Sequence, residues 1–175
     1  MRRTSWLVPE ARLLPLAFLL GFGLLTTGCA TGPIRSQVLD AQTGQPVSGA
    51  VVLGVWTKRV GYPGLASGQL VAVKEVEVDA QGRFELERPE TSYREESITV
   101  YKFGYVAWNN EEVFPSGKHR PDIHVPAQIL LEFFSADWSH QEHIHFIRRV
   151  TNSGLSTRAG QLSFDRAIDH ESRMR

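Results

Sequence analysis

Apolar and polar residues alternate along the middle of the chain, with the period of two that is typical of half-buried β-strands. The clearest example is VEVDAQGRFEL (76–86), in which two alternating runs flank the turn Asp-Ala-Gln-Gly. Asp79 can accept a backbone hydrogen bond at the first position of a type I turn, and Gly82 can adopt the positive φ that ends it. We therefore predict that this turn closes a hairpin.

A near copy of the turn lies earlier in the chain, in VLDAQTGQPVSGAVV (38–52). It begins at Asp40, is one residue longer and has its glycine at Gly44. Because it joins an apolar run at 34–39 to another at 49–56, we predict a second hairpin here.

The strand-like pattern continues through SITVYKFGYVAW (97–108) and PAQILLEFF (126–134). Six or seven short strands are therefore expected between residues 34 and 134, separated by turns rich in Gly and Pro. Many short strands joined in this way indicate a mainly β fold, namely an antiparallel β-sandwich with Greek-key connections.

Three of these segments, taken as a set and in this order, resemble the carboxypeptidase regulatory-like domain, a β-sandwich of the transthyretin (prealbumin) type. The motifs are V-x-D-x-x-T-G-x-P-V-x-G-A-x-V (38–52), V-D-A-x-G-R-F-E-L (78–86) and I-T-V-x-K-x-G-Y (98–105). The resemblance implies the same fold and an accessory, non-catalytic role, as in modules found beside peptidases, in surface proteins and in outer-membrane receptors. It transfers no catalytic residue to this chain.

The pattern changes towards the C-terminus. SHQEHIHFIRRVTNSG begins at Ser139, and Glu142 follows three residues later, which is the spacing of a helix capping box. We predict a helix over 139–152 that packs on the sandwich, and a second short helix within 162–175. The C-terminal extension, 135–175, is therefore expected to be helical.

The N-terminus has the layout of a secretory signal over residues 1–28: a basic start, an apolar run at 13–25 and small residues before Cys29. The run is too short for a transmembrane helix, which needs about 20 residues. The ending LTTGC resembles that of bacterial lipoproteins, whose cysteine is lipidated. This resemblance implies a lipid anchor on Cys29. Ala30 stands where Asp would signal retention in the inner membrane of enterobacteria, so the resemblance favours the outer membrane.

The composition of the chain further limits its possible partners and cofactors. Cys29 is the chain's single cysteine, so no disulfide forms within it, and acylation would remove an otherwise reactive thiol. The formal net charge is zero, which argues against a nucleic-acid partner. The predicted organisation is a signal (1–28), a short tether (29–33), a sandwich (34–134) and the helical extension. No cofactor is expected apart from the covalent lipid.

The histidines are the main candidates for chemistry, because neutral imidazole is the commonest metal ligand. All six lie in the last 57 residues, and His140, His143 and His145 fall within six residues of one another. The cluster is either a metal site or a solvated helix face. On a helix, His140 and His143 would share a side, whereas on a strand His143 and His145 would share a face.

A more specific hypothesis comes from EHIHF (142–146), which resembles the His-x-His-Phe stretch of intradiol ring-cleaving dioxygenases. Those enzymes are also β-sandwiches, and they hold ferric iron through two Tyr and two His. The resemblance implies Tyr62, Tyr93, His143 and His145 as the ligands. Gln-Glu replaces the Arg-Pro that normally precedes the histidines of that family. A helix over these histidines would contradict the analogy.

We therefore predict a lipid-anchored protein on the periplasmic face of the bacterial outer membrane, without enzymatic activity, whose sandwich serves binding or support. Its partners would be the membrane, through the lipid, and a protein of the envelope. An edge strand or the long loop at 57–69 would present the partner surface, unless that loop is a passive connection. The alternative is a metal-binding protein or an iron enzyme that uses the C-terminal histidines.

Overall fold

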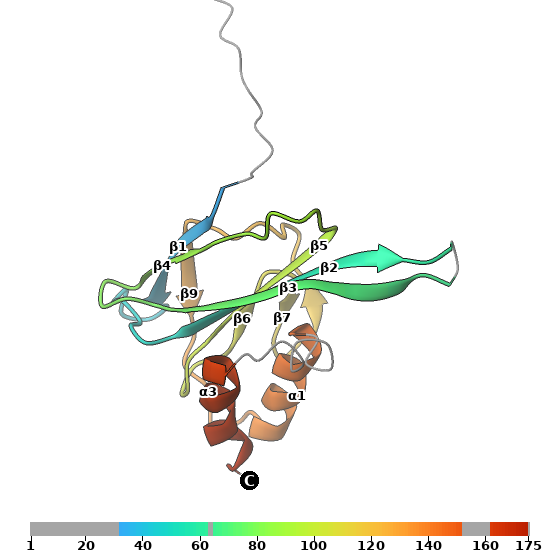
Figure 1. Cartoon of the computed structure of the whole chain (residues 1–175). Coiled ribbons are helices and arrows are strands. Elements are labelled where there is room, and N and C mark those ends of the chain that lie inside the picture. Colours follow the sequence, from blue (N-terminus) through green and yellow to red (C-terminus); the bar gives the residue numbers. More distant parts are fainter. Residues whose placement is uncertain (1–31, 63–64, 152–161, 175) are drawn as a thin grey trace, which may run out of the picture. The chain divides into compact units, whose positions relative to one another are not determined.

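The computed structural model describes residues 32–62, 65–151 and 162–174, and the structural statements below refer to these residues. The predicted signal, Cys29 and Ala30 lie outside them. The strands are β1 (Ile34–Asp40), β2 (Val51–Val60), β3 (Ser67–Glu77), β4 (Arg83–Leu86), β5 (Glu95–Tyr101), β6 (Trp108–Asn109), β7 (Glu112–Val113), β8 (Lys118–His119) and β9 (Gln128–Leu131). The helices are α1 (His140–Val150) and α3 (Leu162–Ser172) (Figure 1).

The fold is mainly β, as the alternation of apolar residues predicts. One sheet has three strands in the order β4-β1-β9, and a second has four in the order β3-β2-β5-β6. The short strands β7 and β8 pair with each other. All pairs are antiparallel except β1 with β9, which run parallel.

The repeated turn forms locally as predicted. Asp79 accepts backbone hydrogen bonds through its side chain from the N–H groups of Gln81 and Arg83, at 2.9 and 2.7 Å. Gly82 has a φ of 76°, and its N–H donates to the Asp79 carbonyl at 3.0 Å. A side chain is excluded at this glycine, because a Cβ would lie 2.6 Å from the Val38 carbonyl oxygen.

The prediction that each turn closes a hairpin is wrong. The turn that ends at Gly82 joins β3 of the four-stranded sheet to β4 of the three-stranded sheet, and the turn from Asp40 to Gly44 joins β1 to β2 in the same way. Period-two alternation identifies the buried face of a strand but not its neighbour. Which sheet a strand joins depends on the apolar surface that the strand buries between the two sheets, and this involves residues far apart in the chain.

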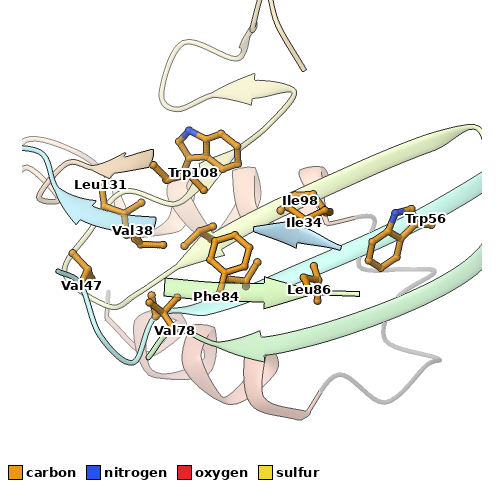
Figure 2. Close-up of a cluster of buried hydrophobic side chains, with 14 residues drawn as sticks. Ile34, Val38, Val47, Trp56, Val78, Phe84, Leu86, Ile98, Trp108 and Leu131 are labelled. Carbon is orange, nitrogen blue, oxygen red and sulfur yellow. The ribbon is translucent and has the colours of Figure 1, made fainter. Parts of the chain in front are cut away.

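Two hydrophobic clusters lie on opposite faces of the four-stranded sheet. The first fills the space towards the three-stranded sheet (Figure 2) and includes Val38, Trp56, Phe84 and Ile98. The second lies towards the helices. It comprises Val51, Leu53, Val55, Tyr101, Ala107, Phe114, Ile144, Phe146, Ile147, Val150 and Phe164. Strand β2 contributes to both clusters, which is why its sequence VVLGVW is a continuous apolar run rather than an alternating one.

Both predicted helices form, and α1 packs on the four-stranded sheet as expected. Ser139 caps α1, accepting a hydrogen bond through its side chain from the Glu142 N–H at 3.3 Å. The N-terminus of α3 is held by Glu75 of β3, which accepts from the N–H groups of Ser163 and Phe164 at 3.1 Å each. A carboxylate there also complements the helix dipole. Neither helix is long and apolar enough to cross a membrane among the residues described.

Candidate functional site

A buried carboxylate on α3 gathers polar side chains from three elements. Glu171 is 2% exposed, and its Oε1 lies 2.7 Å from Nδ1 of His140 and 2.8 Å from Nδ1 of His143, both on α1. Its Oε2 accepts a hydrogen bond from the hydroxyl group of Tyr101, on β5, at 2.7 Å. These four residues, here called the Glu171 cluster, connect both helices to the four-stranded sheet.

The tautomer of His143 follows from its neighbours. The Ala107 N–H donates to Nε2 at 2.8 Å, so Nε2 carries no proton and the ring proton of the neutral imidazole is on Nδ1. Through this proton, Nδ1 donates a hydrogen bond to Glu171. Both ring nitrogens are therefore engaged, and neither offers the free lone pair that a metal ion needs.

The environment keeps Glu171 charged and Tyr101 neutral. Burial alone would raise the pKa of Glu171, but the hydrogen bonds from His143, His140 and Tyr101 outweigh it and hold that pKa below its ordinary value. Burial and the adjacent carboxylate raise the pKa of Tyr101 far above its usual range. The cluster thus consists of one carboxylate with three donors, which is a satisfied arrangement for a buried charge.

We expect the stabilising effect of this carboxylate to depend on pH. A carboxyl group whose pKa is lower in the folded than in the unfolded state stabilises the fold fully above its unfolded pKa, near 4.5 for Glu. That contribution is lost as the pH falls through the lower, folded-state value. Glu171→Gln should therefore destabilise the protein most at neutral pH, and the difference from wild type should shrink below pH 4.5.

Chemical denaturation of both proteins at several pH values between neutral and acid measures this difference. Other carboxylates with lowered pKa, such as Glu96 and Asp40, are present in both proteins and cancel in the comparison. A difference that stays constant across the series would contradict the expectation.

The four residues suggested as iron ligands do not share one environment. Tyr62 is 81% exposed at the end of the β2–β3 hairpin, and the hydroxyl group of Tyr93 donates a hydrogen bond to Glu96. His143 is fully buried, whereas His145 faces solvent on the same helix. Because residues 140–150 form a helix, His143 and His145 do not share a face, and the analogy with the intradiol dioxygenases is wrong on this point. Within the described ranges, no three His, Cys, Asp or Glu side chains are placed to hold a metal ion.

A second polar cluster surrounds Glu96 at the start of β5. It accepts hydrogen bonds from Nε1 of Trp56 at 2.8 Å, from Arg88 at 2.7 and 3.1 Å and from the Tyr93 hydroxyl at 3.1 Å. Burial would raise the pKa of Glu96, but Arg88 and the other donors leave it lowered. Arg88 also donates to the carbonyl oxygen of Gly32 at 2.6 Å, so this cluster holds the chain just before β1.

Sequence reasoning missed Glu171, although a signal for it exists. Phe164, Ile168 and Glu171 recur at the spacing of one helical face, and the first two pack in the second hydrophobic cluster. An acidic residue that continues an apolar stripe predicts a buried partner, because an unpaired charge there would be costly.

Asn109 and Asn110 were also missed. Both are buried at the edge of the four-stranded sheet. The Asn110 side chain accepts from the Ile98 N–H at 2.7 Å and donates to the Glu96 carbonyl at 3.0 Å, as a neighbouring strand would. No pattern in the sequence distinguishes these two from ordinary loop asparagines.

Solvent reaches the Glu171 cluster through His140, which is 36% exposed. His140 lines an open groove of about 790 Å³ between the helices, together with His145, Arg148 and Met174. Its ring stacks on Phe134 at 4.5 Å between centroids. The groove thus presents imidazole and guanidinium groups to solvent, but the buried side of the cluster is occupied by its own hydrogen bonds.

Comparisons of the chain with models of known protein families, with curated proteins and with solved structures found no match.

Proposed function

We propose that this chain is a lipid-anchored protein of the bacterial cell envelope whose β-rich body is a non-catalytic module for binding or support. The observation that carries the proposal is the position of the single cysteine, Cys29, directly after a basic and apolar start. Several acyl chains on one residue would hold the protein firmly at a membrane. Ala30 in the following position favours the periplasmic face of the outer membrane.

We further propose that the body is a Greek-key β-sandwich of the transthyretin type, as in carboxypeptidase regulatory-like domains. Two sheets that share the first hydrophobic cluster support this assignment, as do the two turns that carry the chain from one sheet to the other. The parallel pairing of β1 with β9 brings a late strand beside the first one. A Greek key is built from antiparallel strands, so this parallel pair departs from the pattern at one place.

A role without catalysis is supported by how the buried polar groups are used. Glu171 and Glu96 bind side chains of the protein itself, and His143 has both ring nitrogens in hydrogen bonds. These contacts join helices, sheets and the start of β1, as expected of groups that stabilise the fold. The exposed end of the β2–β3 hairpin, within 57–69, is then the preferred surface for a partner.

Lipidation is tested on the full chain expressed in a Gram-negative host. We expect mass spectrometry of the membrane fraction to show a mature protein that begins at an acylated Cys29. Cys29→Ser should remain as the uncleaved precursor, and Ala30→Asp should move the protein to the inner membrane. A mature chain without acyl groups, or one cleaved elsewhere, would refute the anchor.

A further inference from the structure

The β2–β3 hairpin carries exposed apolar side chains at its end. Tyr62 is 81% exposed, Leu65 83% and Val60 39%. Strand β5 pairs with β2 only as far as Thr57, so the hairpin continues without a neighbouring strand and projects beyond the rest of the sheet (Figure 1). Apolar side chains placed together at the end of a projecting element mark an interaction site.

The end of the hairpin is held by its backbone. The pairing of β2 with β3 continues to Val60 and Ser67, and the Leu65 N–H donates to the Tyr62 carbonyl at 2.9 Å. Gly61 has a φ of 119°, and a Cβ there would lie 2.9 Å from the Leu65 carbonyl oxygen. Tyr62 and Leu65 are therefore joined by a backbone hydrogen bond, next to a position that requires glycine.

Charge along the hairpin favours an anionic surface. The sequence from Lys58 to Lys74 contains three basic residues and no Asp or Glu. Arg59 pairs with Glu95 of β5 at 2.9 Å. Lys74 lies opposite Gly54, away from the hairpin end, and donates to the Arg88 carbonyl, which leaves Lys58. Tyr is enriched where membrane meets water, because its ring is apolar and its hydroxyl is polar. Lys58, close to the hairpin end, adds attraction to anionic lipid headgroups.

The hairpin projects from the end of the fold at which the predicted anchor joins. Arg88 links the Gly32 carbonyl to Glu96, and Glu96 binds the Trp56 indole, so Gly32 and Trp56 lie at the same end of the core. Cys29 precedes Gly32 by three residues, which span at most about 10 Å. Tyr62 follows Trp56 by six residues, which span at most about 20 Å when extended. A bilayer that holds acyl chains on Cys29 is thus within reach of the hairpin.

We propose that the hairpin end inserts Tyr62 and Leu65 into the interfacial layer of the bilayer that holds the lipid anchor. This inference rests on the proposed lipidation of Cys29. Two points of contact, the acyl chains and the hairpin, would fix the orientation of the body on the membrane. The helices and the groove beside His140 would then always face the aqueous side of the membrane.

The test places a reporter on the hairpin in the lipidated, full mature protein. Since Cys29 is the single cysteine and its sulfur is acylated, Leu65→Cys introduces one free thiol, which is labelled with a polarity-sensitive fluorophore. Leu130→Cys is the matched control, because Leu130 is an exposed leucine on β9, paired beside Leu39 at the other end of β1. Both labelled proteins are reconstituted in vesicles of phosphatidylethanolamine and phosphatidylglycerol.

We expect the label at 65 to shift its emission to the blue and to be quenched severalfold by spin-labelled lipids, while the label at 130 stays as in buffer. Equal, water-like signals at both positions on a protein with acylated Cys29 would overturn the insertion and leave the anchor intact. A shift at 65 that occurs only in native envelopes would also overturn it, and would assign the hairpin to a protein partner. A mass spectrum without acyl groups on Cys29 would refute the anchor and, with it, this inference.

Discussion

Replacing Glu171 by alanine is expected to lower the free energy of unfolding by about 3–5 kcal/mol. The carboxylate accepts from Tyr101 and His143, which are both fully buried, and from His140, which solvent reaches. Each buried donor that loses its partner costs about 1–3 kcal/mol, and water can replace the carboxylate only at His140. The loss should also loosen both helices, because the cluster connects them to β5.

Urea denaturation, followed by far-ultraviolet circular dichroism, measures this effect. Glu85→Ala is the matched control. Glu85 forms an ion pair with Arg35 at 2.5 Å, but both side chains are exposed on the three-stranded sheet. We expect that control to be nearly neutral, since exposed ion pairs contribute little. Equal losses for Glu171→Ala and Glu85→Ala would mean that the cluster does not stabilise the fold.

Trp56→Ala is expected to destabilise the protein by about 3–5 kcal/mol, the usual cost of removing a buried Trp side chain. The Trp56 ring is fully buried between the sheets and covers Gly54, where a Cβ would lie only 2.4 Å from its Cη2 atom. Its indole N–H also supports Glu96. The substitution therefore removes packing from the first hydrophobic cluster and removes one hydrogen-bond donor from Glu96.

Trp56→Phe keeps a six-membered aromatic ring in the core and removes the indole N–H together with the rest of the five-membered ring. Its cost should be smaller than that of Trp56→Ala, because part of the ring stays in the core and Glu96 keeps the hydrogen bonds from Arg88 and Tyr93. Thermal and urea unfolding of both variants provide the comparison. If Trp56→Ala lost no more stability than Trp56→Phe, the ring would not be an essential part of the core.

Local signals in the sequence predicted the elements for which neighbouring residues are sufficient. Ser139 and Glu142 located the start of α1, because an N-cap is completed within one turn of helix. Asp79 and Gly82 identified a turn that closes on itself. The same reasoning failed for the strands on either side, since their hydrogen-bond partners come from distant parts of the chain.

The histidines illustrate the same limit. Their spacing was visible in the sequence, but their chemistry depended on the backbone of Ala107 and on Glu171, which lie 36 and 28 residues away from His143. Those contacts exist only after α1 and α3 pack on the four-stranded sheet. They convert a candidate metal ligand into a neutral imidazole with both nitrogens occupied.

The sequence by itself determined the mainly β class, the two helices and their approximate limits, and the two Asp-to-Gly turns. Each of these follows from side-chain periodicity or from hydrogen bonds between residues close in the chain. Only the tertiary structure decided which strands are neighbours, that β2 is buried on both faces and that Glu171 joins His140, His143 and Tyr101. These features depend on burial and on polar groups that must find partners once water is excluded, and both arise when distant segments meet.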